Sequence, residues 1–161
     1  GRCFVWADRS FSLSICAFFG HRDTPMSNNI ERHLEEVIRN LIAQGVDEFW
    51  LCEQGAFDCM ARLTLKELKK EFQGISLCLL PAYHPSNTKI EWIDAQDYDL
   101  IYPDTVANAP PQVAILRRND YIAKNADYIV CYITHDSGGA YRAVQKARKH
   151  KKKIINLAEC I

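Results

Sequence analysis

Five short apolar runs alternate along the chain with longer stretches whose apolar residues recur every three to four positions. The first of these runs is broken only by Ser14, and such continuous patterning is typical of a strand that is covered on both faces. The five runs occupy residues 13–19, 46–52, 75–81, 128–133 and 153–157. Strands separated by helices in this way pair in parallel through right-handed crossovers, so the pattern indicates an α/β protein.

Helical periodicity fills the intervals between these strands. Ser27 or Asn28 can cap a helix that ends at Gly45, because the apolar residues between them keep a helical period. Further helices are predicted over 57–72, from about 113 to 125 and from 140 to about 150. We therefore expect a Rossmann-like three-layer sandwich with a mostly parallel sheet of about five strands in the order 3-2-1-4-5.

Two segments fall outside this regular alternation. Residues 1–12 contain a possible edge strand at 3–7. Residues 83–112 are richer in proline, asparagine and aspartate, with a weak strand signal at 100–102, and we expect a long excursion that lies near the site. We expect residues 1–161 to form a single domain, since the chain is long enough for one full core.

The net charge of the chain bears on which classes of molecule it is expected to bind. Lysine and arginine total 20, and so do aspartate and glutamate, which gives a formal net charge of zero. Non-specific binding to nucleic acid or to an anionic membrane needs a clear basic excess. Nucleic acid is therefore not an expected partner, and no membrane partner is expected.

The apolar and cysteine positions favour a cytoplasmic protein. No apolar run reaches the roughly 20 residues that span a bilayer, and the first nine residues are too mixed for a secretory signal. The seven cysteines are odd in number, and Cys16, Cys52, Cys78 and Cys131 lie in apolar runs, as reduced buried thiols do. Cys52 and Cys59 lack a Cys-x-x-Cys spacing, so no metal site is predicted. No cofactor is predicted either.

Two glycine-containing segments follow the first and fourth predicted strands. These strands flank the topological switch point, where the order of strands in the sheet reverses. The segments are Gly20-His21-Arg22 after the first strand and Ser137-Gly138-Gly139 after the fourth. Glycines allow close approach of a ligand to the backbone, and a helix start offers unpaired N–H groups and a partial positive charge. These features favour phosphate, which Arg22 could bind in a bidentate manner. His21 could donate to the same group or cap local backbone.

Several polar residues near the other strand ends are further candidates. Glu53 follows the second strand and could hold a ribose, or act as an acid or base if burial raised its pKa. Asp58 could reach the site or simply favour a helix N-terminus. Thr134 could bond a ribose hydroxyl or cap the helix that follows it. Adjacent helical residues point about 100° apart, so Arg117 and Arg118 cannot serve one pocket equally, and Arg118 with Asn119 is the better candidate.

Four of these elements, in this order, resemble the SLOG superfamily. They are Gly20-His21-Arg22, Gly55-Ala56-Phe57-Asp58, Arg117-Arg118-Asn119 and Ser137-Gly138-Gly139. The superfamily includes the DNA-processing protein DprA and the Lonely Guy phosphoribohydrolases, and the chain is most similar to its small YpsA-like proteins. The resemblance covers residues 13–157. It implies a phosphate- or nucleotide-binding pocket at the strand ends, with Gly55, Ala56, Arg118 and Asn119 near the ligand.

The chain departs from the hydrolase branch of that superfamily at one motif. Phosphoribohydrolases carry PGGxGTxxE, whereas Gly138-Gly139 continues here into a sequence that places Gln145 where the glutamate would lie. We therefore expect binding of a nucleotide or an ADP-ribose-type ligand without turnover, by a sensor or sequestering protein. One alternative is a Lonely Guy-type N-glycosidase of nucleoside monophosphates, with Glu53 as its catalytic acid or base.

A second alternative is a DprA-like partner of single-stranded DNA. The basic run from Arg148 to Lys153 would then supply phosphate contacts, although positive charge there also complements the end of a helix. The resemblance also leaves room for a homo-oligomer.

Overall fold

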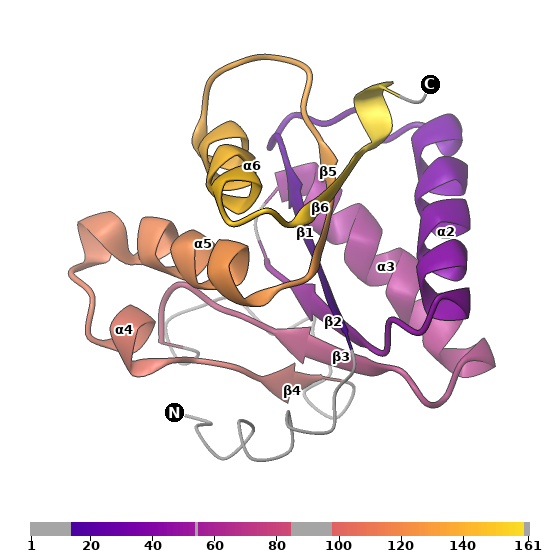
Figure 1. Ribbon diagram of the computed structural model, residues 1–161, viewed down its shortest axis with the longest axis horizontal. Coiled ribbons are helices and arrows are strands. Elements are labelled where there is room, and N and C mark those ends of the chain that lie inside the picture. Colours follow the sequence, from indigo (N-terminus) through magenta and orange to yellow (C-terminus); the bar gives the residue numbers. More distant parts are fainter. Residues whose placement is uncertain (1–13, 54, 85–97, 160–161) are drawn as a thin grey trace.

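The computed structural model describes residues 14–53, 55–84 and 98–159. Its strands are β1 (Ile15–Gly20), β2 (Glu48–Leu51), β3 (Ser76–Leu79), β4 (Asp99–Leu100), β5 (Tyr128–Tyr132) and β6 (Lys153–Asn156). Its helices are α2 (Asn28–Ala43), α3 (Gly55–Glu71), α4 (Asp104–Ala107), α5 (Ala114–Asn125) and α6 (Gly139–Lys149), with 3-10 turns η2 (Pro111–Val113) and η3 (Leu157–Glu159). The six strands form one parallel sheet in the order β4-β3-β2-β1-β5-β6 (Figure 1).

The predicted Rossmann-like α/β fold is confirmed, with a difference at one edge of the sheet. The five predicted strands correspond to β1, β2, β3, β5 and β6 and have the expected order. The sixth strand, β4, pairs with β3 through Cys78 and Leu79, and every strand pair is parallel. Two residues are too few to produce an apolar run, which is why only a weak signal marked β4. The possible edge strand at 3–7 lies outside the described residues.

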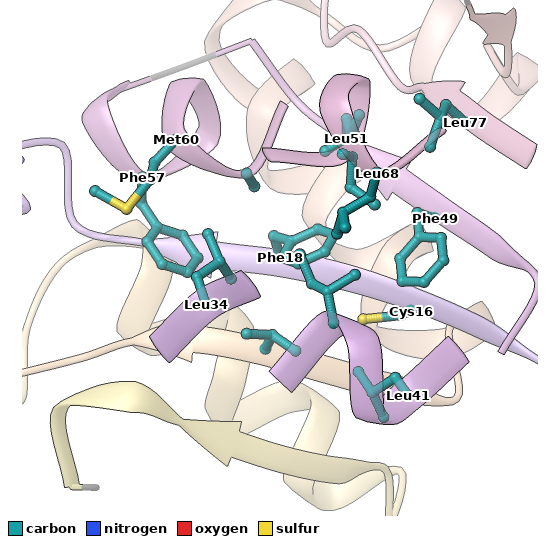
Figure 2. Close-up of a cluster of buried hydrophobic side chains, with 14 of the residues drawn as sticks. Cys16, Phe18, Leu34, Leu41, Phe49, Leu51, Phe57, Met60, Leu68 and Leu77 are labelled. Carbon is teal, nitrogen blue, oxygen red and sulfur yellow. The ribbon is translucent and has the colours of Figure 1, made fainter. Parts of the chain in front are cut away.

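Alternate side chains of β1 enter two separate hydrophobic cores. Cys16 and Phe18 pack with α2 and α3 on one face of the sheet, as the close-up in Figure 2 shows. Ile15, Ala17 and Phe19 pack with α5 and α6 on the other face. Figure 1 shows these two pairs of helices on opposite sides of the sheet. Because both faces of β1 are covered, its sequence is continuously apolar.

The helix after β1 begins as its sequence predicts. The Ser27 Oγ accepts a hydrogen bond of 3.2 Å from the Ile30 N–H, which satisfies one of the free donors of the first turn. Ile30, Leu34, Ile38 and Leu41 of this helix, α2, are buried at a helical period.

The chain reverses its direction of travel across the sheet at β1. From β1 it passes to β2, β3 and β4 on one side, and then returns to place β5 on the other side. Gly20 lies opposite Tyr132 in the pairing of β1 with β5. The loops after these two strands therefore leave the sheet side by side, at the point where ligands bind in open α/β sheets.

The expected excursion at 83–112 contains regular structure in its described part. It supplies β4, α4 and η2, and the Tyr83 hydroxyl donates a 3.3 Å hydrogen bond to the Pro111 carbonyl, near the other end of the excursion. Residues 85–97 lie outside the described residues. No helix in the described parts of the chain is long and apolar enough to cross a membrane. The five described cysteines are free thiols, and four of them are buried.

Candidate functional site

A cavity of about 470 Å³ lies at the carboxyl ends of β1 and β5, which we call the switch-point cleft. Its walls come from four parts of the chain. They are Phe18 to Asp23 from β1 and its loop, Cys52 and Asp58 around β2 and α3, Ile115, Arg118 and Asn119 from α5, and His135, Gly138, Gly139 and Ala140 at the start of α6. Segments more than a hundred residues apart thus meet at the predicted switch point.

The loop after β1 is held close to the sheet by α3. A Cβ atom added to Gly20 would lie 2.3 Å from the Phe57 Cβ, so only glycine permits this approach. The Thr24 hydroxyl donates a 2.6 Å hydrogen bond to the His21 carbonyl and closes the loop. Gly20 therefore contributes to the cleft mainly by letting α3 pack over the end of β1.

The start of α6 forms the opposite wall and is open. Gly138 has a φ of 94°, and an added Cβ at Gly138 or Gly139 would meet no atom within 4 Å. No side chain caps α6, and its first turn holds no acidic residue. The N–H groups of this turn and its positive dipole end are therefore available to an anion in the cleft.

Two histidines connect these loops. The rings of His21 and His135 stack with centroids 3.7 Å apart and planes 8° apart. The Thr134 backbone N–H donates a 3.2 Å hydrogen bond to Nε2 of His21, which requires that nitrogen to be unprotonated. Burial lowers the pKa of His21, and His135 lowers it further, while Asp23 opposes them. His21 is therefore neutral near pH 7 and joins the two loops.

A buried arginine lies in the α5 wall. Arg118 is 4% exposed, and its Nε donates a 3.2 Å hydrogen bond to Oδ1 of Asn119, which is also buried. Arg117 is exposed and does not line the cleft. A buried guanidinium attracts anions more strongly than one on the surface. The buried Asp58 carboxylate lines the same cleft and could accept a hydrogen bond from a hydroxyl group.

Glu53 and Cys52 differ in their relation to the cleft. Burial raises the pKa of Glu53, whereas Arg118 and Arg62 lower it, and Glu53 is not among the residues that line the cleft. Cys52 does line the cleft, and burial raises the pKa of its thiol to about 12. The thiol is therefore protonated at neutral pH and is a poor nucleophile.

The structure brings most of the predicted site residues together. Those that line the cleft are Gly20, His21, Arg22, Asp58, Arg118, Asn119, Gly138 and Gly139. Those outside its lining are Glu53, Gly55, Ala56, Thr134 and Ser137. For both groups, participation in ligand binding stays a prediction.

Four of the residues outside the lining support the loops that form it. Gly55 has a φ of 88° and lies so close to Arg22 that an added Cβ would be 2.9 Å from the Arg22 Cα. The Ala56 N–H donates a 3.2 Å hydrogen bond to the Arg22 carbonyl. Thr134 bonds His21 through its backbone, and the Ser137 hydroxyl lies 3.0 Å from Nδ1 of His135.

Seven residues that line the cleft were not among the predicted site residues: Phe18, Phe19, Asp23, Cys52, Ile115, His135 and Ala140. His135 lies between two residues that were considered, but only the pairing of β1 with β5 brings it against His21. Asp23 and Ile115 also line the cleft. Ile115 precedes Arg118 by three residues on α5, so helical periodicity from Arg118 could have identified it. Within the described residues, no group of three metal-binding side chains could hold an ion.

These features define a Rossmann-like α/β protein with a glycine- and arginine-lined cleft at its switch point. No protein-family model matches the chain, and no curated protein matches it. Among solved structures it is similar to DNA processing protein A from Helicobacter pylori, in a structure that describes the single-stranded DNA binding mode of that protein. The TM-score is 0.60 and the identity 18%, over 89% of this chain and 64% of that chain.

This similarity, at 18% identity, establishes the fold. The chain spans about 64% of the neighbour's length. The match also corrects the expectation that nucleic acid is not a partner, because a protein of the same fold binds single-stranded DNA. A net charge of zero was a weak basis for that exclusion, since cations gathered along one groove can bind phosphates whatever the total charge.

Proposed function

We propose that the switch-point cleft binds the phosphate of a nucleotide or of an ADP-ribose-type ligand, and that the protein acts as a sensor or sequestering protein. The observation that carries this proposal is the uncapped, glycine-lined start of α6 in the same cleft as the buried Arg118. Each feature favours an anion on its own. We further propose that the chain belongs with the YpsA-like members of the SLOG superfamily.

The size and chemistry of the cleft suit such a ligand. A volume of about 470 Å³ lies within the range of small-molecule sites. In the proposed complex, the phosphate accepts hydrogen bonds from the amides of Gly139 and Ala140, and its charge is compensated by Arg118. The Asp58 carboxylate is placed to accept a hydrogen bond from a ribose hydroxyl.

Binding without turnover is supported by the states of three candidate catalytic positions, Glu53, Gln145 and Cys52. Glu53, the candidate acid or base, does not line the cleft. Gln145 replaces the family glutamate, and its Nε2 donates a 2.7 Å hydrogen bond to the Tyr141 hydroxyl. The thiol of Cys52 is held in its protonated form. These observations favour a binding protein over an N-glycosidase.

The proposal is tested by calorimetric titration with adenosine 5′-monophosphate and with adenosine. We expect the phosphorylated compound to bind and the nucleoside to bind at least tenfold more weakly, because a charge-assisted phosphate contact contributes about 1.5–3 kcal/mol. Gly139→Ala should weaken binding of the monophosphate, since the added Cβ occupies the open space at the start of α6.

Gly74→Ala is the matched control, because its added Cβ also meets no atom within 4 Å and Gly74 does not line the cleft. Equal affinity for nucleotide and nucleoside would contradict a phosphate site. If the protein releases free adenine from the monophosphate and the Glu53→Gln variant does not, the proposal of binding without turnover is wrong and the protein is a hydrolase.

Single-stranded DNA is a second candidate ligand, and the structural match favours it. The neighbouring structure describes single-stranded DNA binding by a protein of this fold. A phosphodiester presents the same anionic oxygens to the cleft as a nucleotide does. Salt-sensitive binding of an oligonucleotide would support this candidate.

A further inference from the structure

We propose that the groove between α5 and α6 continues the switch-point cleft and holds the following nucleotides of a single-stranded nucleic acid. This inference rests on the proposed phosphate site. It goes beyond that site by assigning a second binding surface and a ligand longer than one nucleotide.

The groove and the cleft adjoin each other and share part of their lining. The α5–α6 groove has a volume of about 530 Å³, and three of its lining residues, Ile115, Asn119 and Gly139, also line the cleft. A ligand whose phosphate lies at Gly139 can therefore extend along α6 without leaving the surface. A mononucleotide bound in the cleft would leave this second space free.

A line of cations borders the groove on α6. Arg142, Lys146 and Lys149 all line it and are exposed, and their spacing of four and three residues places them on one face of the helix. They span about 10 Å along the helix axis, at 1.5 Å per residue. This is the arrangement needed to follow the phosphates of an extended strand.

The charge of the groove stays positive after its one acidic side chain is counted. Asp120 forms a 2.7 Å ion pair with Lys146, which holds that ammonium group at the groove. Arg142 and Lys149 have no counterpart among the acidic residues that line the groove. Lys149 also belongs to the basic run that ends at Lys153, so the positive surface continues beyond the helix.

The other surface of the groove can accept bases. Ile115 and the half-exposed Leu116 present apolar side chains from α5. Tyr141 lies opposite on α6, and Gln145 holds its hydroxyl. Aromatic and apolar side chains beside a basic line provide base stacking as well as phosphate contacts. In a duplex the bases are turned inward and cannot reach this surface, so the groove fits a single strand.

The experiment compares thymidine 5′-monophosphate with a 5′-phosphorylated thymidine oligonucleotide of about four nucleotides, a length near the lower end of single-strand site sizes. We expect the oligonucleotide to bind at least tenfold more tightly. The double variant Lys146→Gln, Lys149→Gln should lose most of this advantage and keep the affinity for the monophosphate. Its log–log salt dependence should become shallower by about 1.4, because about 0.7 is lost per phosphate contact.

Lys66→Gln, Lys70→Gln is the matched control. It also removes two exposed lysines from one helix. As in the test variant, one of the two lysines forms an ion pair, here Lys70 with Glu67 at 3.0 Å. We expect this variant to bind the oligonucleotide as the unmodified protein does, since α3 covers the other face of the sheet.

The outcomes separate the groove from the cleft. If the monophosphate binds and the oligonucleotide binds no better, the groove proposal is wrong and the phosphate site stands. The same conclusion follows if both double variants bind the oligonucleotide equally. If neither compound binds, the phosphate site and the groove proposal are both wrong.

Discussion

His21 is a neutral side chain on which the shape of the cleft depends. Its Nε2 accepts the hydrogen bond from Thr134, and its ring stacks on His135. A proton on Nε2 would remove the acceptor and place a charge in a buried position. The two loops are therefore joined through a titratable group, whose pKa burial lowers below the value of 6.5.

We predict that acidification destabilises the protein through His21. Burial lowers its pKa in the folded state below the value of 6.5, so the unfolded state binds the proton more readily as the pH falls through 6.5. The melting temperature should fall from about pH 7.5 to about pH 5.5, and it should fall less in His21→Gln.

Removal of an exposed histidine provides the control for this measurement. His150→Gln, at the end of α6, should show the pH sensitivity of the unmodified protein. If His21→Gln and His150→Gln lose the same stability on acidification, the role given to His21 is wrong.

The glycines show what sequence can and cannot reveal at a single residue. Gly20 and Gly139 both belong to segments that follow a strand, so the pattern predicted that both lie at the ligand site. In the structure Gly20 is packed against Phe57, whereas the space around Gly139 is open. The difference depends on how closely α3 approaches β1, and this is decided by side chains distant in the sequence.

At the level of elements, Asn156 holds the ends of β5 and β6 together. Its Oδ1 accepts hydrogen bonds from the N–H groups of Ile133 at 3.1 Å and Ala158 at 3.2 Å. Its Nδ2 donates a 3.0 Å hydrogen bond to the Ile133 carbonyl. Asn156 is buried, and Ile133 and Ala158 are partly buried. The loop from Thr134 to Gly138 begins directly after this anchor.

We predict that Asn156→Ala lowers the free energy of unfolding by about 1–3 kcal/mol, because it leaves partly buried backbone groups without their hydrogen-bond partner. Asn156→Asp keeps the accepting oxygen and should lose less. Urea denaturation measures both values. Asn40→Ala, at an exposed position of α2, is the control, and an equal loss in Asn40→Ala and Asn156→Ala would contradict the anchoring role.

Long secondary-structure elements could be predicted from the sequence, whereas the shortest ones could not. The long helices and the buried strands were predicted because each must repeat its apolar residues over several turns or over a continuous run. The two-residue β4 and the short α4 and η2 contain too few positions for a period. They form through contacts with other elements, such as the pairing of β4 with β3.

At the level of the whole molecule, the parallel order of strands determines where the site lies. The reversal at β1 brings its loop beside that of β5, so the position of the cleft could be predicted from the sequence. The stack of His21 on His135 could not, because it depends on the side-chain conformations of two loops. The line of cations on α6 could likewise not be inferred from a total charge of zero, which says nothing of how the charges are distributed.

The most direct test of the phosphate site is a titration of the ¹⁵N-labelled protein with adenosine 5′-monophosphate, followed by amide NMR spectra. We predict that the largest shift changes occur at Gly138, Gly139 and Ala140, with smaller changes at His21. Gly45, in the turn after α2, should not shift. An absence of changes at the start of α6, or larger changes at Gly45 than at Gly139, would contradict a phosphate site in the switch-point cleft.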